Sequence, residues 1–485
     1  KNIMVQGSMS GVGKSLIAAG LCRVLSEDGH TVAPFKSQNM ALNSFITEEG
    51  AEMGRAQVVQ AEAAGREPDV RMNPILLKPM NDTGSQVIVG GEVRGFMKAA
   101  DYFTYRAELI PEILRAYESL ARENDIIVIE GAGSPAEINL RENDIVNMGL
   151  AELLDAPVLL AGDIDRGGVF AQLFGTVFLL SPEERQRIKG LLINKFRGDP
   201  SLLAPGLTML EEKTGLPVLG TVPFVRTRID DEDSLAEELD KREQDRAIDV
   251  AIIRFPHISN FTDFTPLTLH PMLSVRYVST PGELQSPDLL ILPGTKSTMD
   301  DLKWLWETGL ESRIQRLREE GVLIFGVCGG YQMLGRELYD PEHIEGGYAH
   351  LHGLSLLPAE TTFHEEKTRT RVKGEVTAAA FFGAHVNGYE IHMGETTAEG
   401  EPFCILENGK RDGCVNGTVY GTYLHGLFDS GELTERVAEY LAEKKGLEAG
   451  EIKLRSKDEV MEEEYDRLAA VLRESEDMEK IYALL

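Results

Sequence analysis

The chain is poor in basic residues and in cysteine, and it has no long hydrophobic run. Its 485 residues carry 79 acidic side chains against 49 basic ones, a formal net charge of −30. Proteins that bind nucleic acid gain most of their affinity from Lys and Arg that neutralise phosphates, and anionic membrane surfaces attract basic segments in the same way. The charge balance therefore disfavours both classes, and we expect neither nucleic acid, nor a membrane, nor an obligate protein partner.

Only four cysteines are present, and they are Cys22, Cys328, Cys404 and Cys414. No two of them form a CxxC pair, which argues against a disulfide scaffold or a zinc module and favours a reducing compartment. No stretch reaches the roughly 18 uninterrupted apolar residues of a membrane helix. The first residues resemble a strand rather than a signal segment. We therefore expect a cytoplasmic protein.

Short apolar runs of strand length alternate with helical stretches, a pattern typical of parallel sheets that are buried on both faces. The first series lies at 3–5, 31–35, 125–130, 157–163 and 190–194, and the second lies at 249–255, 288–294 and 322–330. Between the two series, residues 230–246 hold nine acids and three bases. We predict an α/β protein with two doubly wound domains at 1–229 and 248–430, an acidic linker at 230–247, and a C-terminal helical tail at 431–485.

A glycine-rich loop, GSMSGVGKS at Gly7–Ser15, follows the first predicted strand and precedes an apolar-periodic helix. In the P-loop arrangement, backbone N–H groups surround phosphate oxygens, the lysine reaches the terminal phosphates and the hydroxyl ligates Mg²⁺. Ser8 stands where the first glycine of the usual motif belongs, so this loop is one residue longer. The alternative is a glycine turn without a ligand. The residues expected at a nucleotide are Gly7, Ser10, Gly11, Val12, Gly13, Lys14 and Ser15.

Two charged residues lie at the ends of predicted strands. Glu130 ends the strand at 125–130, and Lys36 follows the strand at 31–35. Open α/β sheets bind ligands at the carboxyl ends of their strands, so Glu130 should face the phosphates and hold the metal with Ser15. Alternatively, each residue could merely cap a neighbouring helix.

A second candidate site lies in the run GVCGGYQMLG at Gly326–Gly335, which places Cys328 between an apolar strand and a helix. This is the geometry of a nucleophile elbow, where the helix N-terminus favours the thiolate and the N–H of Gly329 stabilises an oxyanion. A general base is needed, and His425 in TYLHGLFD supplies one. We expect Cys22 to be an inert core residue, and Cys404 and Cys414 to be structural.

Ten histidines suggest a metal site, above all His350 and His352 with His343 and His364 nearby. No carboxylate or cysteine at ligand spacing completes a recognisable site in the sequence, so we expect loop residues rather than a metal centre.

Together these motifs resemble those of the cobyric acid synthase family, glutamine-dependent amidotransferases of corrinoid biosynthesis, over essentially the whole chain. The first domain is similar to dethiobiotin synthetase, a P-loop NTPase whose longer loop has the spacing seen here. The second domain resembles the flavodoxin-like class I glutamine amidotransferases. The residues that carry the resemblance are GSMSGVGKS, KSQNMALNSFIT (36–47), EGAGSPAEINL (130–140), DIDRGGVFA (163–171), NKFRGD (194–199), LPGTKST (292–298), GVCGGYQMLG, GYEIHMG (388–394) and YLHGLFD.

For the first domain, the resemblance implies that ATP and Mg²⁺ convert a corrinoid carboxylate into an acyl phosphate, which ammonia can then attack. Lys14 and Lys36 would neutralise phosphoryl charge, while Ser15 and Glu130 hold the metal. Asn194 and Pro223 occupy the stretches that bind adenine in the dethiobiotin synthetase pattern. The implied substrate-side residues are Gln38, Asn39, Asn43, Asn73 and Lys78. The implied reaction is amidation of the b, d, e and g carboxylates of adenosylcobyrinic acid a,c-diamide.

For the second domain, the resemblance implies that Cys328 attacks the side-chain amide of L-glutamine and that His425 carries the proton. Gly294 would join Gly329 in the oxyanion hole. Many class I amidotransferases have Glu two residues after the histidine, where this chain has Leu427. Asp429 or Glu390 could orient His425 instead, or no third residue does. The role of His392 stays open.

Two other functions are compatible with part of these motifs. Cobyrinic acid a,c-diamide synthases share both domains and the chemistry, although QNMALNSFIT favours the cobyric acid synthase family. A nucleotide switch of the MinD/ParA kind shares the P-loop lineage, but such proteins lack an amidotransferase domain and usually carry an extra early lysine that GSMSGVGKS does not have.

Overall fold

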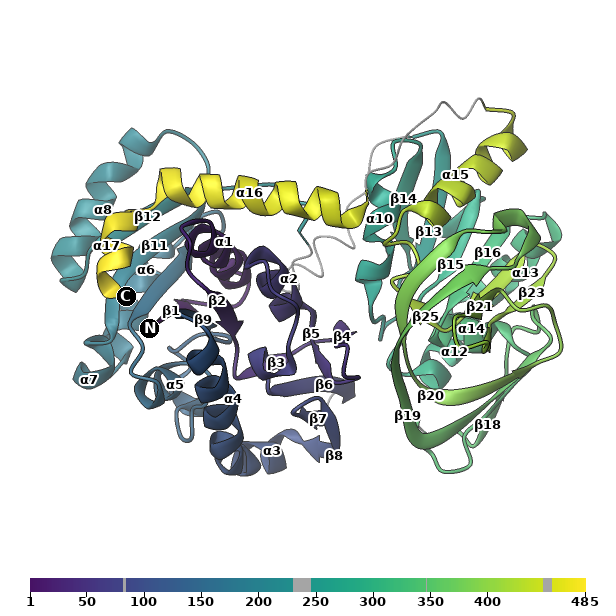
Figure 1. The fold of residues 1–485 in the computed structure, drawn as a ribbon, viewed down its shortest axis with the longest axis horizontal. Coiled ribbons are helices and arrows are strands. Elements are labelled where there is room, and N and C mark those ends of the chain that lie inside the picture. Colours follow the sequence, from purple (N-terminus) through teal and green to yellow (C-terminus); the bar gives the residue numbers. More distant parts are fainter. Residues whose placement is uncertain (82–83, 230–245, 346, 448–455) are drawn as a thin grey trace. The chain divides into compact units, whose positions relative to one another are not determined.

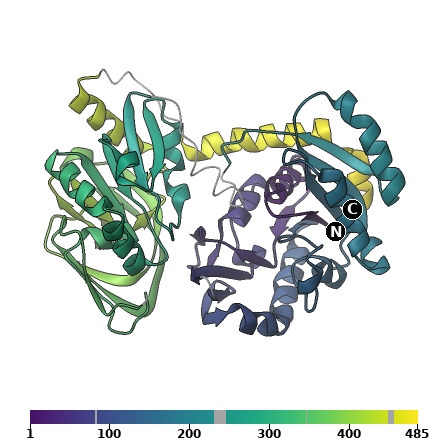
Figure 2. The same ribbon diagram turned by 180° about the vertical axis from the view of Figure 1, so that it is seen from behind.

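The computed structural model describes residues 1–485 except 82–83, 230–245, 346 and 448–455. The chain divides into two compact units (Figures 1 and 2). Unit 1 comprises Lys1–Ala41, Ala51–Ser234 and Met461–Leu485, and unit 2 comprises Leu42–Gly50 and Leu235–Val460. Apart from its last two residues, the stretch 230–247 that the sequence suggests as a linker lies outside the described residues.

Unit 1 is built on a sheet of six parallel strands in the order β12-β11-β10-β1-β9-β2. Val, Ile and Leu dominate these strands, and helices lie on both sides of the sheet (Figure 1). The strands are β1 (Asn2–Gly7), β2 (Val32–Phe35), β9 (Ile126–Glu130), β10 (Val158–Asp163), β11 (Ile188–Phe196) and β12 (Val218–Pro223). The helices are α1 (Lys14–Glu27), α2 (Arg55–Ala63), α4 (Ile110–Glu123), α5 (Met148–Leu153), α6 (Val169–Leu179), α7 (Pro182–Arg185) and α8 (Pro200–Thr214).

A smaller sheet, β3-β6-β7-β8, branches from unit 1 after β2. Its strands are β3 (Gln38–Met40), β6 (Ile75–Asn81), β7 (Gly84–Val89) and β8 (Glu92–Lys98), and α3 (Ala99–Tyr105) follows. The apolar-run pattern of the sequence contains no expectation of this sheet. It places Gln38 and Asn39 directly after Lys36, at the carboxyl edge of the large sheet.

The end of the chain packs on α1. Helices α16 (Lys457–Ser475) and α17 (Met478–Leu484) contribute Ala469, Leu472 and Ile481 to the core of unit 1. A Cβ at Gly20 of α1 would lie 2.3 Å from Leu472, so glycine permits this close helix contact. Ion pairs from Arg23 and Arg473 flank the contact. The preceding helix, α15 (Glu432–Lys445), instead packs in the core of unit 2.

Unit 2 contains a second parallel sheet, β14-β13-β15-β16-β24, with the antiparallel strand β23 at one edge. In chain order the parallel strands run 2-1-3-4-5, which is the flavodoxin-like order. The strands are β13 (Ile248–Ile253), β14 (Leu273–Val278), β15 (Leu289–Leu292), β16 (Leu323–Val327), β23 (Cys414–Asn416) and β24 (Val419–Thr422). The helices are α10 (Thr265–Leu269), α11 (Pro281–Leu284), α12 (Thr298–Glu307), α13 (Leu310–Glu319) and α14 (Gly329–Leu334).

Unit 2 also holds an antiparallel sheet in the order β18-β17-β19-β20-β25, with β21 and β22 beside β19. Its strands are β17 (Glu337–Tyr339), β18 (His350–His352), β19 (Ala359–Val376), β20 (His385–Ala398), β21 (Cys404–Leu406), β22 (Arg411–Asp412) and β25 (Leu424–His425). The expectation that the clustered histidines are loop residues is wrong for His350, His352 and His364, because strand pairing places them in β18 and β19.

The predicted α/β class with two parallel sheets is confirmed. Among the residues described, no helix has the length and apolar character needed to cross a membrane.

Candidate functional site

The glycine loop of unit 1 connects β1 to α1 at the carboxyl edge of the large sheet. Gly11 and Gly13 have φ angles of 72° and 90°, which favour glycine. A Cβ at Gly13 would lie 2.4 Å from the amide nitrogen of Asn194, and that amide donates 2.7 Å to the carbonyl of Val12. Asn194 therefore braces the loop from β11, whereas Pro223 lies at the end of the edge strand β12.

Glu130 is the most densely bonded carboxylate of this edge. Its Oε1 accepts 2.9 Å from Ser15 Oγ and 2.7 Å from Lys36 Nζ, and the side chain is buried. Its Oε2 accepts from Gln57 at 3.3 Å and Gln60 at 2.5 Å, both on α2. The contact between Glu130 and Lys36 agrees with the strand-end rule, whereas sequence patterning contains no expectation for the two glutamines. In the sequence, the two glutamines are marked only by their three-residue spacing, which places them on one face of α2.

Ser15 and Glu130 offer a hydroxyl and a carboxylate oxygen, the kind of ligand that Mg²⁺ prefers. Here the Ser15 hydroxyl donates to Glu130 Oε1 at 2.9 Å, a bond that a shared Mg²⁺ would replace. Lys14 and Lys36 supply positive charge beside them, and Lys14 Nζ donates to the carbonyls of Met9 and Gly133.

A cavity of 460 Å³ adjoins this edge, and Lys14, Lys36, Gln38 and Asn39 are among its lining residues. The structure thus brings two of the five expected substrate-side residues to the loop. The other three have different surroundings. The Asn73 amide bonds the backbone at Gly54, Lys36 and Ile75, and Lys78 forms an ion pair with Glu52 in the interior. Asn43 lies in the segment Leu42–Gly50, which is part of unit 2.

In unit 2, Cys328 lies in a sharp turn between β16 and α14. Its φ of 52° and ψ of −109° lie outside the ordinary regions, as at a nucleophile elbow. A Cβ at Gly330 would lie 2.0 Å from the carbonyl of Leu292, so the turn requires glycine there. The N–H of Gly329 belongs to the first helical turn, where N–H groups have no intrahelical acceptor. It therefore remains suited to an oxyanion.

His425, at the end of β25, faces this turn. Its Nδ1 lies 2.6 Å from Oδ2 of Asp263, and the other oxygen of Asp263 accepts 3.1 Å from the N–H of Gly426. Its Nε2 is buried and has no hydrogen-bond partner among the described residues. A Cβ at Gly294 would lie 3.2 Å from the imidazole, which places the expected oxyanion glycine beside the ring.

Asp263 sets the charge state of this histidine. Burial lowers the pKa of His425, but the charge and hydrogen bond of Asp263, together with the neighbouring Cys328, outweigh burial and raise the pKa to about 9. At neutral pH the imidazole is therefore protonated. A protonated imidazole in this position can give its proton to a leaving group.

The residues suggested by sequence for the third position have other partners. Glu390 bonds Lys410 through both oxygens at 2.9 and 3.0 Å, and Asp429 lies 3.6 Å from Lys457. Sequence reasoning missed Asp263, which follows β13 (Ile248–Ile253) in the chain. The carboxyl-edge rule that singled out Glu130 is the signal that could have found it.

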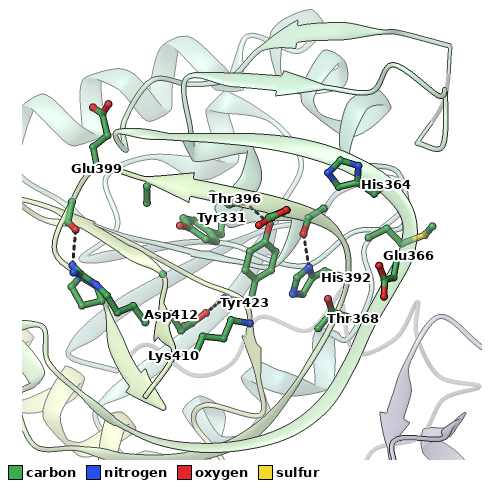
Figure 3. Close-up of a pocket in the computed structure, with 18 residues that line it drawn as sticks. Tyr331, His364, Glu366, Thr368, His392, Thr396, Glu399, Lys410, Asp412 and Tyr423 are labelled. Carbon is green, nitrogen blue, oxygen red and sulfur yellow. Dashed lines mark hydrogen bonds between the residues drawn. The ribbon is translucent and has the colours of Figure 1, made fainter. Parts of the chain in front are cut away.

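A second cavity, of 810 Å³, lies in unit 2 (Figure 3). The rings of His392 and Tyr423 stack at its wall with centroids 3.7 Å apart. Burial lowers the pKa of His392 to about 4, although its bond to the carbonyl of Gly394 opposes the shift. His392 is therefore neutral where His425 is charged.

The histidines of β18 share a carboxylate. Pairing with β17 brings Glu337 opposite His352, and Glu337 bonds His350 at 2.6 Å and His352 at 3.1 Å. The sequence shows no carboxylate at ligand spacing from these histidines, but strand pairing places Glu337 beside them. The bonds to the two histidines, His350 first, lower the pKa of Glu337 against its burial.

The remaining cysteines are all buried. Burial raises the pKa of the Cys22 thiol, and the nearby Glu130 adds to that shift. Burial, with Asp412 and Glu375, raises the pKa of Cys404 to about 12. These thiols are protonated at neutral pH.

Comparison with family models matches both units. Residues 249–433 match the CobB/CobQ-like glutamine amidotransferase domain, and residues 3–238 match the CobQ/CobB/MinD/ParA nucleotide binding domain. The cobyric acid synthase of Lachnoclostridium phytofermentans is 53% identical over 509 residues, covering 100% of this chain and 99% of the relative. Those of Ruminiclostridium cellulolyticum and Streptococcus sanguinis are 54% and 53% identical, cover 100% of this chain, and are themselves covered to 97% and 99%.

Solved structures resemble part of the chain. PurLQS from Thermotoga maritima has a TM-score of 0.32 and 18% identity, covering 41% of this chain and 99% of that one. A glutamine amidotransferase crystal structure has a TM-score of 0.30 and 22% identity, covering 41% of this chain and 99% of that one.

Proposed function

We propose that this chain, which belongs to the cobyric acid synthase family, amidates the b, d, e and g carboxylates of adenosylcobyrinic acid a,c-diamide to give adenosylcobyric acid. The chain is a glutamine-dependent ligase with a nucleotide-binding domain and an amidotransferase domain. One observation carries the finer proposal. The same chain holds a phosphate loop with Lys14, Lys36 and Glu130, and a Cys328–His425–Asp263 array.

In unit 1, a substrate carboxylate oxygen would attack the γ-phosphorus of ATP, releasing ADP and leaving an acyl phosphate. Ammonia would then add to the acyl carbon and expel inorganic phosphate. An unphosphorylated carboxylate would not react with ammonia in this way, because its oxygen is not a leaving group. Lys14 and Lys36 would balance the charge on the transferred phosphoryl group. A Mg²⁺ held by Ser15 and Glu130 would supply further neutralisation of phosphate charge.

In unit 2, the Cys328 sulfur would attack the side-chain amide carbon of L-glutamine. The N–H groups at Gly329 and Gly294 would stabilise the tetrahedral oxyanion, and the His425 Nε2 proton would pass to the departing nitrogen. The products are ammonia and a glutamyl thioester. Water would then hydrolyse the thioester with His425 as base, releasing glutamate and restoring the thiol.

The test counts the amides. Purified chain is incubated with ATP, Mg²⁺, glutamine and adenosylcobyrinic acid a,c-diamide, and mass spectrometry follows the corrinoid, with an ATP-free reaction as control. The proposal expects four amides added per corrinoid, only with ATP. An inert a,c-diamide, combined with two additions to undecorated cobyrinic acid, would instead identify an a,c-diamide synthase.

A further inference from the structure

The segment Leu42–Gly50 lies in the N-terminal half of the sequence yet packs as part of unit 2. The chain on either side of it, up to Ala41 and from Ala51, belongs to unit 1. Its strand β4 (Ser44–Ile46) is buried and lies against β19 and β20 of the antiparallel sheet. Neither the amidotransferase motifs nor the phosphate loop accounts for this placement.

The segment holds Tyr389, a buried residue of β20. The Tyr389 hydroxyl donates 2.9 Å to the carbonyl of Ser44, and the Phe45 ring meets the Tyr389 ring edge-on with centroids 5.9 Å apart. Tyr389 in turn stacks on the imidazole of His425, with centroids 5.3 Å apart and planes inclined by 22°. One side chain thus connects the segment to the histidine.

Asn260 forms a second connection. Its Oδ1 accepts 3.2 Å from the N–H of Ser44, and its amide nitrogen lies 3.3 Å from Nδ1 of His425. Because Nδ1 carries a single hydrogen and Asp263 lies nearer, at 2.6 Å, that hydrogen goes to Asp263 and the amide acts as a packed neighbour. Asn260 also has a left-handed φ of 51° immediately before the 3₁₀ turn Phe261–Phe264, which carries Asp263.

We infer that residues 42–50 are a positioning segment for His425, acting through Tyr389 and Asn260. The inference rests on the proposed role of His425 as proton carrier. The bond from Nδ1 to Asp263 fixes the direction of the imidazole but leaves the plane of the ring free to turn about that bond. The stacked Tyr389 ring fixes that plane, and Ser44 and Phe45 fix Tyr389. The amidotransferase unit is therefore completed by a piece of chain from the other half of the sequence.

The positioning segment is tested in the full chain with Tyr389→Phe and Phe45→Ala. The first removes only the hydroxyl that bonds Ser44, and the second removes the edge contact without touching His425. Small misplacements of a catalytic group cost rate rather than substrate binding, so we expect kcat for glutamine hydrolysis to fall about three- to tenfold. The KM for glutamine and the ammonia-dependent synthesis should stay unchanged. Because both variants act through one ring, the double variant should be no slower than the slower single variant.

Two controls separate positioning from general damage. Tyr440→Phe removes a hydroxyl on α15, away from the segment, and should leave kcat unchanged. Phe45→Tyr keeps the ring and should restore kcat. Wild-type kcat in both Tyr389→Phe and Phe45→Ala, or a parallel loss of ammonia-dependent synthesis, would overturn the inference. Cys328→Ser distinguishes this failure from failure of the proposed function, since glutamine hydrolysis that survives Cys328→Ser refutes the proposed function itself.

Discussion

Each unit buries a carboxylate against a cation, but the two cations differ in kind. In unit 1, Glu130 bonds Lys36 at 2.7 Å, and in unit 2, Asp263 bonds His425 at 2.6 Å. A lysine keeps its charge through the physiological pH range, whereas an imidazole can lose its charge within or just above it. The cysteine site therefore has a positive charge that pH can remove.

The two carboxylates also differ in how many groups share them. Glu130 accepts from four side chains, Ser15, Lys36, Gln57 and Gln60. Asp263 accepts from His425 and from one backbone N–H. A shared carboxylate assembles a charged surface for a ligand, whereas one devoted to a single imidazole fixes a tautomer and a charge state. The first arrangement suits phosphate and the second suits proton transfer.

The largest effect is expected from Lys14→Ala, which removes a positive charge from the glycine loop of unit 1. Transition-state cations of phosphoryl transfer are worth about 10³-fold or more, so synthesis should fall by that factor with glutamine and with ammonia as donor. Chromatography of the corrinoid products measures both rates. Lys189→Ala removes an exposed lysine and serves as the matched control. Ammonia-dependent synthesis that survives in Lys14→Ala would contradict the role given to this site.

Cys328→Ser should separate the two units most cleanly. Loss of the thiolate nucleophile should lower glutamine-dependent synthesis by about 10³-fold or more. Synthesis with ammonia should remain, because only the nitrogen source is lost. Cys404→Ala, in the same unit, controls for removal of a buried thiol. Equal loss with both donors would show that the two sites do not divide the reaction as proposed.

Asp263→Asn removes the charge that distinguishes unit 2. By analogy with the carboxylate of a serine–histidine pair, we expect kcat for glutamine hydrolysis to fall by about 10²- to 10⁴-fold. The pKa of His425 should fall from about 9, because burial, which lowers it, is then unopposed by Asp263. As the pH is raised, the residual rate of Asp263→Asn should therefore begin to fall at a lower pH than the wild-type rate does.

The stability of the folded protein should depend on pH through the same histidine. A histidine whose pKa is raised from 6.5 to about 9 stabilises the folded state fully below pH 6.5, and this contribution is lost as pH rises through about 9. Asp263→Asn should abolish it, which denaturant unfolding at pH 6 and pH 10 can measure. For the pH dependence of glutamine hydrolysis, Glu130→Gln is the control, since it should leave that dependence unchanged. If the decline of the hydrolysis rate at high pH is not shifted in Asp263→Asn, Asp263 does not set the charge state of His425.

The parts that sequence predicted are those whose geometry is local. The glycine loop at Gly7–Ser15 and the turn at Cys328 are each encoded in one contiguous run of residues, so each can be recognised as a motif in the sequence. Asp263 lies 162 residues from His425 along the chain, and only the sheet order brings them together. The carboxyl-edge rule makes Asp263 a candidate, but only the strand order identifies it as the partner of the histidine.

The long strands β19 and β20 show a second limit. Their register shifts between Phe363 and Thr368, which interrupts the two-residue alternation by which half-buried strands are recognised. The expected substrate-side residues Asn73 and Lys78 illustrate a third, because resemblance along the chain does not tell a ligand-facing side chain from one that holds the backbone or a buried Glu52.

The smallest catalytic effect is expected from Leu472→Ala, which tests whether the two units differ in thermal stability. Leu472 is fully buried where α16 packs on α1, and removing such a side chain costs about 2–5 kcal/mol of unfolding free energy. Leu441→Ala makes the same change in α15 of unit 2. Activity of both variants at low temperature should be near that of the wild type. On heating, Leu472→Ala should lose ammonia-dependent synthesis before glutamine hydrolysis, and Leu441→Ala should show the reverse order. The same order in both variants would mean that the units unfold together and that the C-terminal helix stabilises the whole chain rather than unit 1.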